Sequence, residues 1–146
     1  FVLGTSDLAK NLHCTHTRDR LPMNTTLGLC ILAARAAGIA IVDGVHLDLS
    51  DDSGFEYSCR QGLEMGFDGK TLIHPKTIDM ANYVYSPSEN ELKWSKKIIA
   101  AHGQAKKEGQ GVIVIDGKVI EELDVQNAER LVALADKIAA TQNNSS

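Results

Sequence analysis

The chain has 146 residues, of which 43% are hydrophobic and 23% charged, and its formal net charge is −4. This is the size and composition of a globular protein domain that can bury a core of its own. No basic stripe is present, which argues against nucleic-acid binding, and no apolar run approaches the roughly 20 residues that a membrane-spanning helix requires.

The first part of the chain, residues 1–85, is expected to alternate short buried strands with helices. The strands are expected at Phe1–Leu3, Ile39–Val42 and Lys70–Ile73. The helices are expected from a cap at Asn24 or Thr25 to Gly38, from a cap at Ser53 through Gly54–Met65 to a stop at Gly66, and over Ile78–Tyr85. Because no initiator methionine or signal peptide precedes the first strand, we expect the C-terminal part of a longer protein.

Two segments between these elements are expected to be loops. Gly4–Asp7 follows the first strand, and Ser6 or Asp7 could cap the short apolar turn after it. Cys14–Met23 is polar and charged without periodicity, which predicts a loop on the surface.

A polar side chain follows each of the three expected strands, namely Asp7, Asp43 and His74. Continuous apolar strands separated by helices indicate a parallel sheet in an α/β fold, either doubly wound or a segment of a barrel. Polar loops after three consecutive strands favour the barrel, in which functional side chains lie at the carboxyl ends of strands.

The second part, residues 86–146, shows strong local signals. Ser88 followed by Glu91 forms a capping box for a helix from Glu89 to about Lys107. Asp116-Gly117 between Val112–Ile115 and Lys118–Ile120 predicts a hairpin, a helix is expected over about Asp124–Ala140, and the polar tail TQNNSS is expected to fray. We expect this hairpin-helix extension to serve as a lid or a subunit contact.

The polar residues of the first part each allow more than one interpretation. Asp7 is either a helix cap or a carboxylate ligand for Mg²⁺, which binds one or two carboxylates and keeps several waters. His74 is either hydrogen-bonded to backbone, in contact with a ligand, or, least favoured, a metal ligand. Lys70 could contact a phosphate or be an ordinary charge at a strand edge. The spacing after Asp48 excludes an EF-hand loop, because Ser53 and Cys59 occupy the places of its Gly and Glu.

The three cysteines, Cys14, Cys30 and Cys59, are odd in number and far apart. This pattern predicts unpaired thiols in a reducing compartment. We therefore expect a cytoplasmic protein or, in a eukaryote, one of the mitochondrial matrix.

Five strings, in this order, resemble one family over essentially the whole chain: GTSDL, DGVHLDLSDDSGF, GFDGKTLIHPKTI, SPSENELKWSKKII and GKVIEELDVQNAERL. They resemble the C-terminal half of the citrate lyase β-subunit-like CoA-ester lyases, the group of HpcH/HpaI aldolase relatives that includes malyl-CoA lyase. The resemblance implies a (β/α)₈ TIM barrel, of which residues 1–85 would hold the last three strands.

The resemblance also implies site residues. Asp7 matches the aspartate that holds Mg²⁺ (or Mn²⁺ in its place), while the matching glutamate and a substrate-binding arginine would precede Phe1. Ser6 would touch the substrate carboxylate, and Ile73 and His74 would line the acyl-CoA site. Glu121 stands where many members have a catalytic aspartate that reaches a neighbouring subunit.

Three functions follow from the resemblance. The first is a Mg²⁺-dependent carbon–carbon lyase that splits a 3-hydroxyacyl-CoA such as malyl-CoA into acetyl-CoA and the 2-oxo acid glyoxylate, working as a homo-oligomer (a trimer or hexamer). The second is a malyl-CoA thioesterase of the same family. The third is a non-catalytic fragment that binds CoA or mediates assembly, and the isolated chain is expected to be inactive.

Overall fold

The computed structural model describes residues 1–109 and 111–143. The chain forms two compact units, unit 1 (Phe1–Tyr85) and unit 2 (Ser86–Ser146). Within the described ranges no helix combines the length and the apolar character that crossing a bilayer would take. The assignment of unit 1 to a barrel and of unit 2 to a lid or subunit contact remains a prediction.

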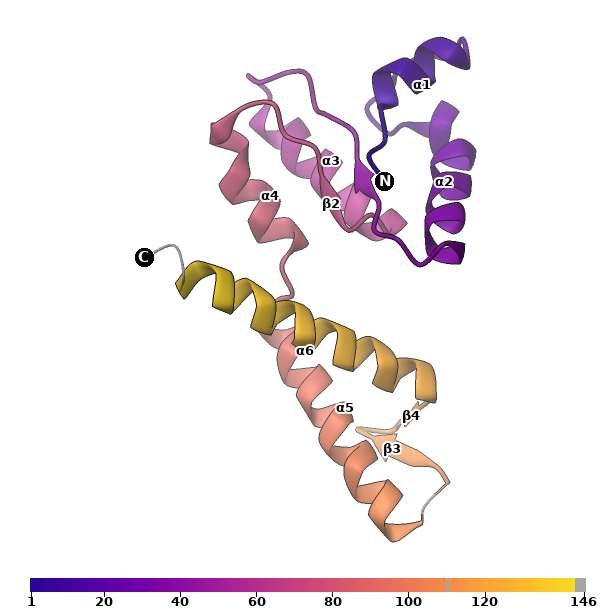
Figure 1. Ribbon diagram of the computed structural model, residues 1–146, viewed down its shortest axis with the longest axis vertical. Coiled ribbons are helices and arrows are strands. Elements are labelled where there is room, and N and C mark those ends of the chain that lie inside the picture. The colour runs from indigo at the N-terminus through magenta and orange to yellow at the C-terminus, as the bar shows by residue number, and fades with distance from the viewer. Residues whose placement is uncertain (110, 144–146) are drawn as a thin grey trace. The chain divides into compact units, whose positions relative to one another are not determined.

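Unit 1 alternates helices with short parallel strands (Figure 1). Its elements in chain order are α1 (Thr5–Asn11), the 3₁₀ turn η1 (Leu21–Met23), α2 (Asn24–Ala36), β1 (Val42–Asp43), α3 (Asp52–Met65), β2 (Gly69–Lys70), the 3₁₀ turn η2 (Pro75–Thr77) and α4 (Ile78–Tyr85). The expected helices and strands occur in the expected order, and α1 is an additional helix.

Three parallel segments lie side by side in unit 1. Val42 pairs with Gly69 and Asp43 with Lys70, and on the other side of β1 Val2 forms a parallel bridge with Val42. The amide of Leu3 donates to the carbonyl of Val42 at 3.1 Å. Sequential parallel segments joined by helices confirm an α/β arrangement, whereas closure into a (β/α)₈ barrel remains a prediction.

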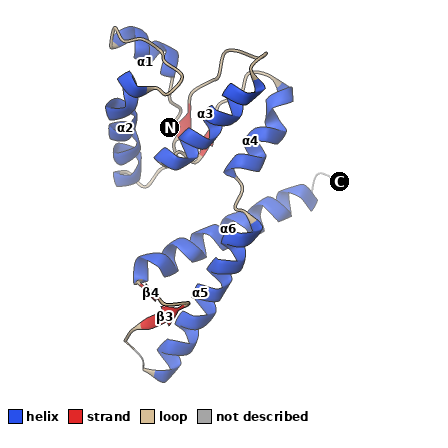
Figure 2. Ribbon diagram, turned by 180° about the vertical axis from the view of Figure 1, so that it is seen from behind, coloured by secondary structure: helices blue, strands red, loops and turns tan. Residues whose placement is uncertain are grey.

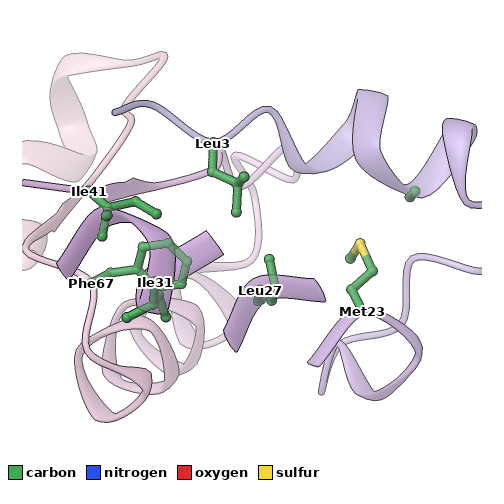
Figure 3. Packing of buried hydrophobic residues seen from close by; sticks show 8 residues of the cluster. Leu3, Met23, Leu27, Ile31, Ile41 and Phe67 are labelled. Atoms are coloured by element: carbon green, nitrogen blue, oxygen red, sulfur yellow. The ribbon is translucent and has the colours of Figure 1, made fainter. Parts of the chain in front are cut away.

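One apolar cluster packs α2 against the strands of unit 1 (Figure 3). Its fully or nearly fully buried side chains include Leu3, Met23, Leu27, Ile31, Ile41 and Phe67. Ile31 and Leu27 lie one helical turn apart, so the buried stripe of α2 follows the helical period. A second cluster joins α3 to α4 through Phe55, Cys59, Ala81 and Val84.

The strands are shorter and shifted compared with the expectation. Ile39 lies outside β1, and the chain leaves the ladder after Thr71, whose amide donates to the carbonyl of Asp43 at 2.9 Å. Ile73 is therefore 53% exposed, and the expected buried strand Lys70–Ile73 is wrong beyond its first residue. The Asp68 carboxylate accepts the Ile41 amide at 2.8 Å, and this side-chain bond satisfies backbone just before the ladder begins.

Several expected loops and caps are wrong. Gly4–Asp7 is not a loop, because α1 starts at Thr5, and neither Ser6 nor Asp7 caps it. Asn24 and Thr25 lie inside α2, which has no side-chain cap. Asp51 rather than Ser53 caps α3, accepting the Gly54 amide at 2.8 Å.

The expected surface loop Cys14–Met23 reaches into the interior at its end. Arg20, with a left-handed backbone (φ 56°), and Met23 are both buried, and Pro22 opens the 3₁₀ turn that carries Met23 inward. Gly66 does end α3, with φ 105°, as its lack of a side chain allows.

Unit 2 consists of α5 (Glu89–Glu108), the hairpin strands β3 (Ile113–Ile115) and β4 (Lys118–Ile120), and α6 (Glu122–Asn143), with the strands drawn in red in Figure 2. The capping box is confirmed, since the Glu91 amide donates to Ser88 Oγ and the Ser88 amide to Glu91 Oε2. Asp116 and Gly117 both have positive φ, as a two-residue hairpin turn requires. The tail was expected to fray, but Thr141–Asn143 belong to α6, and residues 144–146 lie outside the described residues.

Candidate functional site

The start of α1, after the first parallel segment, packs directly against the loop that follows β1. Thr5, which follows Leu3, is buried, and its side chain fills the space beside Gly44, which follows β1. A Cβ at Gly44 would lie 2.6 Å from Thr5 Cγ2, closer than any van der Waals contact allows. The residue type at position 44 therefore fixes how the loop that leads to Ser6 and Asp7 lies at this edge of the sheet.

Ser6 and Asp7 lie exposed in the first turn of α1. A carboxylate in the first turn favours a helix through the macrodipole, which is an adequate structural reason for Asp7 alone. Within residues 1–109 and 111–143, however, no hydrogen bond or ion pair uses the Asp7 carboxylate. An exposed, unpaired carboxylate at the carboxyl end of a parallel strand also has the chemistry of a ligand for a hard cation.

Ile73 and His74 follow β2 at the same end of the sheet, and both are exposed. His74 Nδ1 accepts the Lys76 amide at 3.1 Å and so caps η2. The first of the three interpretations of His74, a bond to backbone, is thus observed, and this bond leaves Nε2 free for a ligand. No hydrogen bond of the described residues joins the pair Ile73–His74 to the pair Ser6–Asp7.

Glu121 lies in unit 2, immediately before α6, with an exposed side chain. Its amide donates to Asp124 Oδ2 at 2.9 Å, which satisfies one free backbone donor at the start of the helix. The catalytic and substrate-binding roles expected for Glu121, Asp7, Ser6, Ile73 and His74 remain predictions.

Sequence reasoning missed a buried ion cluster beneath the strand ends. Asp43 is 0% exposed, and its carboxylate bonds Arg20 Nη1 at 2.6 Å and Lys70 Nζ at 3.1 Å. Lys70 Nζ also donates to the carbonyl of Gly44 at 2.8 Å. Lys70 is therefore not an edge charge, and Asp43 does more than end a strand. No sequence pattern near Asp43 indicates these ion pairs, because its partners Arg20 and Lys70 are 23 and 27 residues away along the chain.

Neighbouring polar groups complete this cluster. Arg20 Nε donates to Gln61 Oε1 at 2.7 Å, and Gln61 in turn donates to the carbonyl of Asp19. Gly62 leaves room for both Asp43 and the Tyr85 hydroxyl, since a Cβ there would lie 2.8 Å from Asp43 Oδ2 and closer still to that hydroxyl. Burial raises the pKa of Tyr85 above its ordinary value, so the phenol stays neutral beside the ions.

Desolvation also changes the acidity of two other groups in this region. It lowers the pKa of Lys70, an effect that the Asp43 carboxylate partly opposes. Burial raises the pKa of the Cys59 thiol to about 11, so the thiol stays protonated and poorly nucleophilic at neutral pH. All three cysteines are free, as expected.

The described residues hold no group of three or more histidine, cysteine or carboxylate side chains that could enclose a metal ion. A Mg²⁺ site needs less, because this ion usually binds one or two carboxylates and keeps several waters. The unpaired Asp7 carboxylate fits one ligand of such a site.

Comparison with known proteins places these features in a family. The family model described as HpcH/HpaI aldolase/citrate lyase matches residues 1–75. A (3S)-malyl-CoA thioesterase of Cereibacter sphaeroides is 50% identical over 139 residues, which cover 95% of this chain and 49% of that protein. An L-malyl-CoA/beta-methylmalyl-CoA lyase of the same species is 34% identical over 137 residues, covering 94% and 43%.

A solved structure supports the fold over most of the chain. CitE of Mycobacterium tuberculosis, in complex with magnesium, acetoacetate and coenzyme A, matches with a TM-score of 0.75 and 27% identity, covering 92% of this chain and 51% of that one. The chain thus spans about half the length of the relatives that it matches.

Proposed function

The chain belongs to the HpcH/HpaI aldolase/citrate lyase family, and from this premise we propose that the whole protein is a Mg²⁺-dependent carbon–carbon lyase acting on a 3-hydroxyacyl-CoA thioester. The proposed substrate is malyl-CoA, and the products are acetyl-CoA and glyoxylate. Related proteins that act on malyl-CoA support the substrate, and the CitE complex with magnesium and coenzyme A supports the cofactor and the thioester carrier.

The observation that carries the proposal is the unpaired Asp7 carboxylate at the end of the first parallel segment. Asp7 would hold Mg²⁺ together with water and a carboxylate from outside this chain. When bound, the ion would neutralise the carboxylate of the small acid and polarise its adjoining oxygen. Ser6, one residue away and exposed, would donate a hydrogen bond from its hydroxyl to the same substrate carboxylate.

The remaining predicted residues position the thioester and move the proton. Ile73 offers exposed apolar surface beside the free Nε2 of His74, which suits the pantetheine arm and its amides. In cleavage, the bond between C2 and C3 of malyl-CoA breaks as the 3-hydroxyl loses its proton, and C2 gains a proton to give acetyl-CoA. Glu121, as a general acid and base, would exchange the proton at C2.

A second candidate, a malyl-CoA thioesterase, is favoured by the 50% identity to a protein of that activity. Hydrolysis gives free malate and CoA, so the product separates the two candidates. Malyl-CoA is incubated with the whole protein with and without Mg²⁺, and glyoxylate, acetyl-CoA and malate are measured. Glyoxylate with acetyl-CoA supports the lyase, malate alone supports the thioesterase, and the absence of all three supports the non-catalytic role.

Asp7→Asn tests the proposed metal ligand. The amide keeps the shape but removes the charge that attracts the cation, so Mg²⁺ should bind at least about tenfold more weakly and activity should fall by about 10²-fold or more. Asp79→Asn, in the first turn of α4, is a matched control that should keep both. An unchanged Mg²⁺ requirement in Asp7→Asn would contradict the assignment.

Assembly and location are proposed as well. The hairpin buries Ile115 and Ile120 on one side but exposes Val114 and Val119, a cross-strand pair, on the other. An apolar outer face of this kind suits a second copy of the chain, and we propose a trimer or hexamer, to be measured by light scattering. The free thiols support a cytoplasmic location, which fractionation of the source cells would test.

A further inference from the structure

Unit 1 contains a cavity of about 240 Å³ beside the carboxyl ends of β1 and β2. Its walls come from Thr5, from the loop before η1, from the loop after β1, from α3 and from Lys70. Since a water molecule occupies about 30 Å³, the cavity has room for a small tetrahedral anion with several waters.

The charges around this cavity do not balance. Arg20 and Lys70 both line it, with side chains 5% and 1% exposed, and they share the single buried carboxylate of Asp43. Two cations against one anion leave an excess positive charge in a buried cluster, where unpaired charge is costly. Desolvation lowers the pKa of Lys70, and the Asp43 carboxylate only partly opposes this effect.

The nearby carboxylates have other partners, and Asp51 also interacts electrostatically with Arg18. Asp51, the acidic side chain in the cavity wall, is fixed at the start of α3 by the Gly54 amide and Ser53 Oγ. Glu56 pairs with Arg60 on the outside of α3.

A third cation, Arg18, also lines the cavity and is exposed. Its guanidinium carbon lies 5.1 Å from the centre of the Tyr57 ring.

Other polar groups complete the wall. The His46 ring packs edge-on against Phe55, and its buried Nε2 has no hydrogen-bond partner in the described part of the chain. The hydroxyl-bearing residues Thr5 and Ser58 line the same cavity. A buried polar atom without a partner beside excess positive charge indicates a missing acceptor.

We propose that this cavity binds a phosphate group, supplied either as free phosphate or as part of CoA. The chemistry is that of an anion with several acceptor oxygens held by guanidinium, imidazole and hydroxyl groups. Loops after neighbouring strands near the end of an α/β barrel commonly form phosphate sites, and the cavity occupies the corresponding place in the expected barrel. Binding by CoA rests on the proposed function, whereas binding of free phosphate does not.

The test measures binding of inorganic phosphate to the whole protein by calorimetry, with no metal or substrate present. Arg18→Gln removes an exposed cation from the cavity wall without touching the buried cluster, so the variant should fold. It should weaken phosphate binding about tenfold, the effect of losing one good charged contact. Arg60→Gln removes the same charge from the outer side of α3 and should change the affinity less than twofold.

Competition identifies the source of the phosphate group. If CoA supplies it, inorganic phosphate should compete with CoA, and Arg18→Gln should weaken binding of CoA but not of pantetheine, which lacks phosphate. If free phosphate is the ligand, phosphate and CoA should bind together. Either result supports the site, and the NMR signals of the His46 ring should shift when phosphate is added.

Absence of phosphate binding below about 10 mM, or equal weakening by Arg18→Gln and Arg60→Gln, would overturn the proposal. These results do not depend on catalysis. A protein that binds no inorganic phosphate could still cleave malyl-CoA, and a protein that cleaves no thioester could still bind phosphate.

Discussion

The Asp43 carboxylate is the counter-charge of two buried cations, and removing its charge should destabilise unit 1. In Asp43→Asn the side chain keeps its shape but loses the charge that faces Arg20 Nη1 at 2.6 Å and Lys70 Nζ at 3.1 Å. Both cations then lie buried without a counter-charge. Removing one partner of a buried ion pair costs about 3–5 kcal/mol, which is a large part of the stability of an ordinary domain.

The assay is equilibrium unfolding in urea, followed by fluorescence and circular dichroism. With a slope of about 1–3 kcal/mol per molar urea, a loss of at least about 3 kcal/mol lowers the midpoint by about 1 M or more. Glu56→Gln is the matched control, because it removes a carboxylate from an exposed pair with Arg60 and should cost no more than about 1 kcal/mol.

A double variant isolates the charge effect. In the Asp43→Asn background, Lys70→Met removes one of two buried cations that have no counter-charge, so it should be more favourable to stability there than in the unchanged protein. If Asp43→Asn changed the unfolding free energy no more than Glu56→Gln, the cluster would not hold the strand ends together, and the reasoning would fail.

Three further predictions rest on separate contacts. Because burial raises the pKa of Cys59 to about 11, its thiol should resist alkylation at pH 9 in the native protein but not in urea. Its contribution to stability should be lost as pH rises from the ordinary thiol range to about 11. Peptide mass spectrometry measures the labelling, and rapid labelling of the native protein would refute the burial. Gly44→Ala should lower the free energy of unfolding by about 1–3 kcal/mol, because the new Cβ would meet Thr5. In a urea titration, Thr5→Ala should relieve part of this loss. Equal effects of Gly44→Ala with Thr5 and with Ala at position 5 would show that the two residues do not touch. Ser88→Ala removes the capping box and should lower the free energy of unfolding by about 1 kcal/mol, as measured by thermal unfolding. A change below about 0.3 kcal/mol would mean that the cap contributes little.

The features that the sequence predicted correctly depend on neighbouring residues. The capping box at Ser88 and Glu91 and the turn at Asp116-Gly117 each arise from groups within three residues of each other, so the pattern alone carries the geometry. The order of parallel strands and helices in unit 1 likewise follows from apolar runs and their spacing.

The features that it missed depend on distant partners. Arg20 was expected in a polar surface loop, and Lys70 was left open between a phosphate contact and an edge charge. Nothing near either residue in the sequence indicates that both meet Asp43 in the interior. The start of α1 at Thr5 was also missed. Thr5 packs against Gly44, which lies in the loop after β1 and is distant in the sequence. Tertiary contacts of this kind override local capping preferences.

The most direct test of the proposed activity is the fate of malyl-CoA with the purified whole protein in the presence of Mg²⁺. We predict acetyl-CoA and glyoxylate in equal amounts, in a reaction that depends on Mg²⁺ and is lost in Asp7→Asn. Free malate and CoA without glyoxylate would contradict the lyase and establish the thioesterase, and an intact substrate would contradict both.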